Sequence, residues 1–305
     1  MHKRIGSAYL APEGLETVLE AALARHGVVV RWHGRLALSE SAPVDCPWAL
    51  DIWLDPVMLP VASVKAAADA LRAVQRNWSA YGAGLHRRMA LIEARLPPVK
   101  AAPLAFPQPA PTAHLGGWTL LEPGLLLASA RKRSPVPNGE WRFIEDRTGP
   151  PSRAYLKLWE ALTRLGVWPG PGETCLDLGA SPGGWSWVLA QLGAQVTAVD
   201  KAPLDPAVAA LPTVTALTDS AFALEPRPVD WLVCDVIAYP VRTLALLERW
   251  LPAVRHAICT VKFQGETDFA TAEQIAALPG VRLVHLFHNK HELTVLYGRD
   301  GLAAG

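Results

Sequence analysis

The chain has 305 residues, of which 50% are hydrophobic and 19% charged, so it is long enough to bury ordinary cores and is expected to form two domains. This composition excludes an intrinsically disordered chain, and the net charge of +1 provides no overall attraction for a polyanion. Residues 1–15 contain no apolar leader, and the most apolar later stretch, 118–128, is interrupted by Glu122 and Pro123, so the sequence predicts a soluble, cytoplasmic protein with no membrane partner.

The beginning of the chain predicts a small α+β unit. Apolar residues recur at helical spacing in three segments and form short β-like runs in three others. The predicted helices are 14–26, 61–78 and 84–96, and the predicted strands are 28–32, 36–38 and 49–54. The second and third helices carry outward-facing basic residues, which makes the surface of this unit basic.

A proline-rich segment, 97–111, follows this unit and contains six prolines. Such a density excludes helix and interior strand, so the segment is interpreted as an extended connector. Two strands are then predicted at 118–121 and 125–130, followed by a basic loop at 131–139. The loop is expected to be exposed, either as a solvated turn or as a phosphate-contacting segment. We place the domain boundary after residue 135, giving domains 1–135 and 136–305.

The second half alternates helices and strands around the segment C-L-D-L-G-A-S-P-G-G-W at 175–185. This segment predicts a strand, a glycine loop whose missing side chains leave room for a ligand, and the start of a helix. A helix is expected from Ser152, and Asp200, Asp219 and Asp235 each follow a later strand-like run. Such alternation is typical of a doubly wound, mostly parallel sheet with ligands at the carboxyl ends of its strands.

The spacing of the glycine loop distinguishes among nucleotide-binding motifs. A dinucleotide fingerprint requires G-x-G-x-x-G and a P-loop requires G-K-[ST], and neither order occurs here. The pattern D-x-G-x-x-x-G-G, with Asp200 at the end of the next strand, instead fits a nucleoside cofactor without a pyrophosphate, which is S-adenosylmethionine. The alternative is a structural glycine turn in a protein without a cofactor.

Charge and cysteine usage add two further expectations. Residues 1–157 hold 19 basic and 13 acidic residues, a net charge of +6, whereas residues 158–305 hold 10 and 15, a net charge of −5. The basic half therefore either binds a polyanion or attracts the acidic half. The four cysteines lack C-x-x-C spacing and the histidines lack partner ligands, so reduced, structural cysteines and no metal site are predicted.

Six segments from residue 152 to the end form one further pattern: S-R-A-Y-L-K-L-W-E-A at 152–161, D-L-G-A-S-P-G-G-W at 177–185, V-D-K-A-P-L at 199–204, V-C-D-V at 233–236, V-K-F-Q-G at 261–265 and H-N-K-H-E-L-T-V at 288–295. Together they resemble the Rossmann-like RNA ribose 2′-O-methyltransferases of the FtsJ/RrmJ type, and among them the RlmM group, which acts on a cytidine of the large-subunit rRNA.

The resemblance implies a Rossmann-like class I methyltransferase domain with a seven-stranded sheet, preceded by a smaller THUMP-like α+β domain that contributes to RNA binding. It also implies a catalytic tetrad of Lys157, Asp235, Lys262 and Glu292, with Lys262 as the general base. The implied cofactor residues are Gly179, Ser181, Pro182, Gly183, Gly184, Trp185, Asp200, Asp219 and Asp235.

The chemistry explains why these residue types are required. A ribose hydroxyl is a poor nucleophile at neutral pH, and a lysine amine serves as its base only when it is unprotonated. The expected enzyme is thus an S-adenosylmethionine-dependent methyltransferase acting on 23S rRNA or an assembly particle. The alternatives are a catalytically silent rRNA-binding factor of the same fold and a small-molecule methyltransferase.

Overall fold

The computed structural model describes residues 3–99 and 102–302. The chain folds as two compact units, of which the first comprises Met1–Pro103 with Ala110–Arg142, and the second Leu104–Pro109 with Phe143–Gly305. The boundary expected after residue 135 lies within the first unit. The proline-rich segment is shared between the units, and its residues 100–101 lie outside the described residues.

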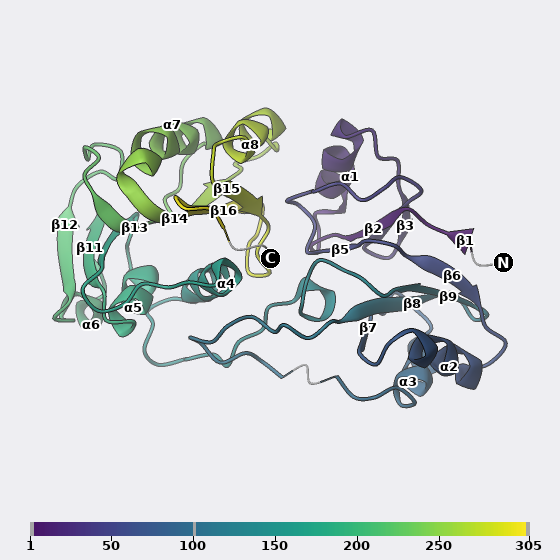
Figure 1. Cartoon of the computed structure of the whole chain (residues 1–305). Helices are drawn as coiled ribbons and strands as arrows, with labels where there is room; N and C mark the ends of the chain where they lie inside the picture. Colours follow the sequence, from purple (N-terminus) through teal and green to yellow (C-terminus); the bar gives the residue numbers. More distant parts are fainter. Residues whose placement is uncertain (1–2, 100–101, 303–305) are drawn as a thin grey trace. The chain divides into compact units, whose positions relative to one another are not determined.

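The first unit contains two sheets and three helices (Figure 1). A four-stranded sheet has the order β3-β4-β2-β5 and a five-stranded sheet the order β1-β6-β9-β8-β7. The elements are β1 (Lys3–Arg4), β2 (Ser7–Leu10), α1 (Glu16–Arg25), β3 (Arg31–His33), β4 (Leu36–Ser39), β5 (Asp51–Trp53), β6 (Val57–Pro60), α2 (Val64–Val74), β7 (Trp78–Ala80), α3 (His86–Glu93), β8 (Gly116–Glu122) and β9 (Leu125–Ser129).

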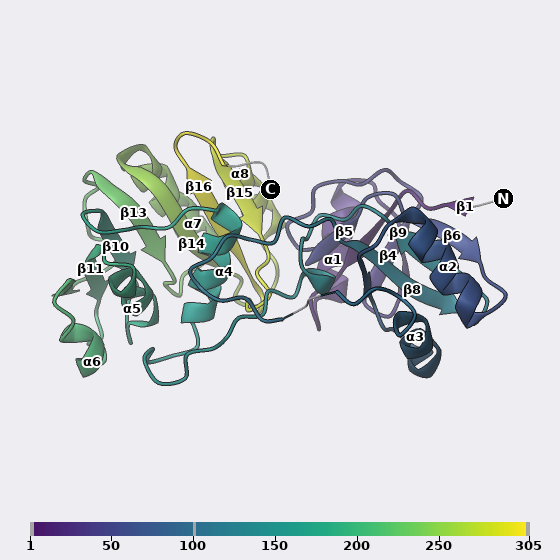
Figure 2. The same ribbon diagram turned by 60° about the horizontal axis from the view of Figure 1, so that its bottom comes forward.

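The five-stranded sheet has an apolar core on each face, as the period of two along its strands requires. On one face, Trp118 of β8 and Leu126 of β9 pack with the buried residues of α2 and α3. On the other face, Leu127 joins a cluster that includes Trp53 of the four-stranded sheet. Figure 2 shows α2 and α3 lying over the five-stranded sheet. The hydrophobic pattern therefore produces layered α+β packing.

Two details differ from the sequence-based prediction. The helix expected over 61–78 ends at Val74, because the chain is extended at Gln75 and Trp78 begins β7, which pairs in parallel with β8. The prediction also missed β1 and β6, which are two and four residues long. Strands as short as these lack the alternation that a longer strand displays.

The second unit is a seven-stranded sheet of order β12-β11-β10-β13-β14-β16-β15. The strands from β12 to β14 are parallel and β16 is antiparallel to both of its neighbours, which confirms the mostly parallel, Rossmann-like sheet. The elements are α4 (Tyr155–Leu165), β10 (Thr174–Leu178), α5 (Gly184–Gln191), β11 (Gln195–Asp200), α6 (Pro206–Ala209), β12 (Val214–Thr218), β13 (Val229–Cys234), α7 (Pro240–Trp250), β14 (Val254–Lys262), α8 (Phe269–Ala276), β15 (Val281–Val284) and β16 (Glu292–Gly298).

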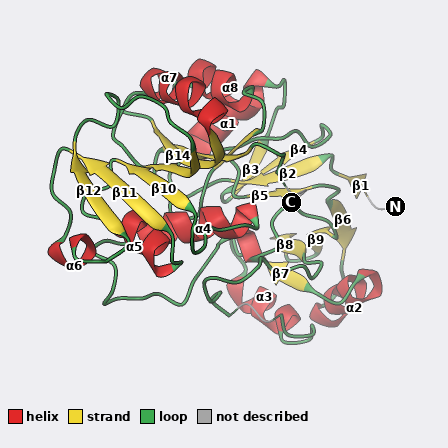
Figure 3. Ribbon diagram, turned by 60° about the vertical axis from the view of Figure 1, so that its left-hand side comes forward, coloured by secondary structure: helices red, strands yellow, loops and turns green. Residues whose placement is uncertain are grey.

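Helices cover both faces of this sheet, with α7 and α8 on one face and α4 and α5 on the other (Figures 1 and 3). The central strands are buried on both faces and read as nearly continuous apolar runs. The segment 104–109 packs onto α4, where the Phe106 ring stacks on Trp159 with 4.9 Å between ring centroids. The part of the connector that belongs to this unit is therefore anchored by an aromatic contact.

The basic loop after β9 is not exposed throughout, contrary to the prediction. The Lys132 side chain is 1% exposed, and its Nζ lies 2.8 Å from the fully buried Asp51 carboxylate and donates to the Val136 carbonyl at 2.7 Å. Arg131 and Arg133 are exposed, as expected, but each pairs with an aspartate of the same unit. The three cations thus tie the loop to its own unit, and they do not form a free phosphate-binding patch.

Replacing Lys132 by Met should lower the free energy of unfolding by about 3–5 kcal/mol, because the Asp51 charge would remain buried without its partner. Arg131→Ala, in the same loop, should cost less than about 1 kcal/mol because its ion pair is solvated. Urea unfolding of both variants tests this, and equal losses would contradict a structural role for Lys132.

Candidate functional site

The candidate site lies at the carboxyl edge of the seven-stranded sheet, where the strand order reverses. From β10 the chain runs outward to β11 and β12, and then returns so that β13 pairs with the other side of β10. In open α/β sheets, ligands bind at such a switch point. The glycine loop after β10 and Asp235 after β13 flank this point.

The glycines of the loop are required by its packing against the protein. Gly179 and Gly183 have φ values of +78° and +112°, which L-residues with side chains rarely adopt. A Cβ at Gly179 would lie 2.9 Å from Val236, and one at Gly183 would lie 2.8 Å from Val208. A Cβ at Gly184 would similarly meet the segment before α4. The packing of the loop against the protein therefore requires these glycines, and their role in letting the loop approach a ligand stays a prediction.

Two predicted cofactor residues present carboxylates at this edge. Asp200, at the end of β11, accepts hydrogen bonds from the backbone N–H of Ser181 at 3.0 Å and of Ala202 at 2.9 Å. Asp219 follows β12, is exposed, and accepts from the Ser220 N–H at 2.6 Å. Each carboxylate oxygen has a second lone pair, so both residues are still able to accept from hydroxyl or amino donors of a ligand. A ligand bearing such donors and a positive charge fits this edge.

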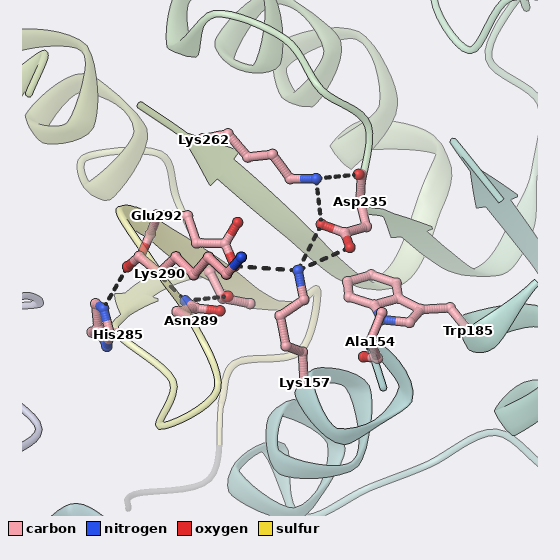
Figure 4. Close-up of polar contacts among 10 residues, drawn as sticks. Ala154, Lys157, Trp185, Asp235, Lys262, His285, Asn289, Lys290 and Glu292 are labelled. Carbon is pink, nitrogen blue, oxygen red and sulfur yellow. Dashed lines mark hydrogen bonds and ion pairs between the residues drawn. The ribbon is translucent and has the colours of Figure 1, made fainter. Parts of the chain in front are cut away.

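Two further predicted cofactor residues, Pro182 and Trp185, differ in exposure. Pro182 is exposed in the loop, and its carbonyl accepts from the Asp205 N–H at 2.9 Å. The Trp185 side chain is 3% exposed and donates its indole N–H to the Ala154 carbonyl at 2.9 Å, as Figure 4 shows. The Trp185 indole therefore ties α5 to the start of α4. A contact between this residue and a cofactor stays a prediction that would involve its backbone.

The fold brings together the four residues of the predicted tetrad, which come from four different elements. Lys157 lies on α4, Asp235 directly follows β13, Lys262 ends β14, and Glu292 begins β16. Lys262 and Glu292 are direct partners in the antiparallel pairing of β14 with β16. Figure 4 shows the Lys157, Asp235 and Glu292 side chains converging, with Lys262 reaching Asp235 from the opposite side.

Asp235 is the shared partner of both lysines. Its two carboxylate oxygens lie 3.0 and 2.9 Å from Lys157 Nζ, and Oδ1 also lies 3.0 Å from Lys262 Nζ. Lys262 Nζ additionally donates to the Asp235 carbonyl at 2.7 Å, and Lys157 Nζ donates to Glu292 Oε1 at 3.2 Å. The four side chains are 11–19% exposed, so they form a connected and largely desolvated charge network.

The charges of this network shift the pKa values of Asp235 and Lys157. Burial by itself would raise the pKa of Asp235, but the adjacent ammonium groups outweigh it and hold that pKa below its ordinary value. Burial would likewise lower the pKa of Lys157, but Asp235 and Glu292 outweigh it and raise that pKa. Lys157 is therefore an ammonium ion at neutral pH, positioned as a cation and not as a base.

Asp177 is a further carboxylate of the site, and sequence reasoning assigned it no role. It lies in β10, is 1% exposed, and accepts a hydrogen bond from Ser186 Oγ at 2.7 Å. Its Oδ1 atom has no hydrogen-bond partner within the described part of the chain. Burial raises the pKa of Asp177 to about 7. Its place in the D-x-G pattern was visible in the sequence, but its burial was not.

The free energy of unfolding should fall as the pH rises from about 4 to 7, because the folded state holds the Asp177 proton more tightly than the unfolded chain does. Asp177→Asn should flatten this part of the pH profile. Asp230→Asn is the matched control. Hydrogen bonds from Thr174 lower the pKa of Asp230, so its contribution to the free energy of unfolding is lost only below this pH range and the variant should leave the slope unchanged. Urea unfolding from pH 4 to 8 measures both, and an unchanged profile in Asp177→Asn would contradict the prediction.

Residues 150–290 match the family model of the FtsJ-like methyltransferases. The chain is 43% identical over 176 residues to the ribosomal RNA large subunit methyltransferase M of Halorhodospira halophila, covering 53% of this chain and 51% of that protein. It is 37% identical over 196 residues to the protein of the same name from Alkalilimnicola ehrlichii, covering 59% and 53%. The chain thus spans about half the length of the curated relatives it matches.

Two features are absent from the described residues, 3–99 and 102–302. None of their helices is long and apolar enough to cross a membrane. They include no group of three or more histidine, cysteine, aspartate or glutamate side chains arranged to hold a metal ion. The four cysteines are buried and free.

Proposed function

We propose that the protein transfers a methyl group from S-adenosylmethionine to a ribose 2′-hydroxyl of 23S rRNA, because residues 150–290, within the second unit, match the family model of the FtsJ-like methyltransferases. The observation that carries this proposal is the Lys157–Asp235–Lys262 network, joined by Glu292, beside the glycine loop. The names of the relatives support rRNA as the substrate class. By resemblance to the RlmM group, the target nucleotide is a cytidine.

The residues at the carboxyl edge have separate roles in this proposal. S-adenosylmethionine, when bound, supplies a methyl group activated by its positively charged sulfur. Asp200 would hold the ribose hydroxyls of the cofactor, Asp219 its adenine amino group, and the loop from Gly179 to Trp185 its methionine part. Asp235, whose pKa is lowered, carries the negative charge that complements the sulfonium.

Lys262 is the proposed general base. The neutral form of the Lys262 amine would accept the 2′-hydroxyl proton as the new O–C bond forms and the S–C bond to the methyl group breaks with release of S-adenosylhomocysteine, and the resulting ammonium ion would pair with Asp235. Lys157 is excluded from this role because its raised pKa keeps it protonated. Lys157 instead remains a cation beside the reacting groups, held between Asp235 and Glu292.

Lys262→Ala should lower kcat for methyl transfer to deproteinised 23S rRNA by about 10²–10⁴-fold, because the base is removed. Lys262→Arg should lose a similar factor although it keeps the charge, since a guanidinium does not give up its proton. Incorporation of labelled methyl groups measures this. Lys65→Ala, an exposed lysine of α2, is the control and should retain activity. Full activity in Lys262→Arg would eliminate the general-base role.

Asp200→Ala should raise the Kd for S-adenosylmethionine by more than about tenfold, because hydrogen bonds to a charged group contribute about 1.5–3 kcal/mol each. The same variant releases the Ser181 N–H, which loosens the loop. Lys262→Ala should leave the cofactor Kd nearly unchanged. Titration calorimetry on both proteins measures the difference, and equal weakening would refute this division of roles.

We further propose that the first unit is a THUMP-like module that contacts the RNA. We assign the candidate RNA surface to helix α3, because the cations of the loop at 131–133 are paired within the unit. Arg87 and Arg88 lie there next to Leu85 and Leu91, which are 38% and 48% exposed. No ion pair of these two arginines occurs among the described residues. In RNA-binding surfaces, cations contact the phosphate groups and adjacent exposed apolar side chains pack against unstacked bases.

Replacing both Arg87 and Arg88 by Ala should raise the KM for rRNA and leave kcat unchanged, because phosphate contacts contribute to affinity and not to chemistry. The slope of log K against log salt concentration should decrease in magnitude by about 2. Arg131→Ala with Arg133→Ala removes the same charge from the paired loop and should have a smaller effect. If the loop variant weakened RNA binding more, the α3 surface would be the wrong one.

The two alternatives remain distinguishable from the main proposal. A catalytically silent rRNA-binding factor would bind 23S rRNA but incorporate no methyl groups. A small-molecule methyltransferase would turn over S-adenosylmethionine without rRNA. If the wild-type chain methylates neither free 23S rRNA nor a large-subunit assembly particle, the proposed function is wrong.

A further inference from the structure

Glu160 on α4 has a buried carboxylate that the proposed chemistry does not use. Its side chain is 0% exposed, and burial raises its pKa to about 7. Burying a carboxyl group is costly unless its oxygens are hydrogen-bonded. The location of its partners therefore indicates what this carboxyl group does.

The partners of Glu160 are its own helix and a distant loop. Both carboxylate oxygens accept from the backbone N–H of Phe287, at 3.0 and 2.9 Å. Arg164, one turn further along α4, lies 2.6 Å from Oε1 and neutralises the charge. The contact to Phe287 is thus a fixed attachment of α4 to the segment 285–291.

The segment 285–291 connects β15 to β16, and the residue that follows it is Glu292 of the tetrad. Asn289 reinforces this connection, because its side-chain amide donates to the Glu292 carbonyl at 3.2 Å and to Thr294 Oγ1 at 3.1 Å. The His285 ring bonds the Lys290 carbonyl at 3.0 Å, as drawn in Figure 4. A displacement of this loop would therefore move Glu292.

The helix that bears Glu160 also bears Lys157, three residues earlier. Residues at this spacing lie on one face of a helix. Lys157 contacts Glu292 at 3.2 Å, and Glu160 contacts the loop that leads into Glu292. One face of α4 thus holds the hairpin at two points, and only one of them belongs to the tetrad.

We propose that Glu160 is a positioning residue for methyl transfer. By binding the Phe287 N–H, it fixes the loop 285–291 so that Glu292 stays within hydrogen-bonding distance of Lys157. Lys157 in turn holds Asp235, so the attachment is transmitted to the shared carboxylate. This inference rests on the proposed function, since it assigns Glu160 a part in the same reaction.

The test is a double-mutant cycle with Glu292→Ala, read as kcat for methyl transfer to 23S rRNA. Glu160→Ala alone should lower kcat by about tenfold to a hundredfold, because small displacements of a reacting group cost such factors. In the Glu292→Ala background it should lower kcat less than about twofold further, since the group that it positions is gone. If the loss in kcat of the double variant equals the product of the two single-variant losses, the proposal is overturned.

Glu160→Gln and Leu158→Ala complete the design. Gln keeps an acceptor for the Phe287 N–H, so it should rescue most of the activity lost in Glu160→Ala. If Glu160→Ala does not fold, Glu160→Gln takes its place in the cycle, with a smaller loss that again disappears in the Glu292→Ala background. Leu158 is fully buried on α4, so Leu158→Ala should lower the stability of the protein. Any loss in kcat that it causes should be the same in the wild-type and the Glu292→Ala backgrounds, because this residue does not act through Glu292.

Hydrogen exchange separates failure of this inference from failure of the proposed function. The Phe287 amide should be protected in the wild-type protein, and Glu160→Ala should speed its exchange while leaving the amides of β14 unchanged. Unchanged exchange at Phe287 would overturn the positioning role even in an active enzyme. An inactive wild-type chain with the expected exchange would instead reject the methyl-transfer proposal and retain the attachment.

Discussion

The carboxylate of Asp235 is the contact on which the candidate site depends. Two ammonium groups reach it, at 2.9 Å from Lys157 and 3.0 Å from Lys262. Without this negative charge, two cations in a largely desolvated pocket would repel each other, and burial would oppose their charged forms. The aspartate therefore holds both lysine amino groups at one place in the pocket.

The sheet topology brings these charges together. Asp235 follows β13, and Lys262 ends the neighbouring strand β14, so the parallel pairing places them at the same edge. The antiparallel strand β16 runs in the opposite direction, and its first residue, Glu292, therefore lies at that edge as well. Lys157 comes from α4, which precedes the whole sheet in the chain. A correct site thus requires the entire second unit to be folded.

Each unit contains a buried charge pair that attaches one segment to another, and only the pair in the second unit is connected to the candidate site. In the first unit, Lys132 and Asp51 are both almost fully buried and fasten a loop to the sheet. In the second unit, Glu160 is equally buried, but its attachment leads directly to Glu292. A buried ion pair by itself is weak evidence for function. The distinction comes from what the attached segment carries.

The sequence by itself determined the residue types and their local setting. The glycine loop, the acids after successive strands and the mostly parallel sheet follow from patterns within about ten residues, because steric limits and hydrophobic periodicity act locally. The four tetrad residues were instead implied by the resemblance of their surrounding segments to the FtsJ-type methyltransferases. The end of α2, the short strands β1 and β6 and the burial of Lys132 did not follow from such patterns.

Only the tertiary structure decided which charges meet and which are buried. Lys132 and Asp51 are separated by 81 residues, and Glu160 and Phe287 by 127, so no local pattern relates them. The glycines of the loop were likewise recognisable in the sequence, but their close neighbours Val208 and Val236 come from elements formed later in the chain. Burial and charge compensation depend on long-range contacts, and these exist only once the strands have paired.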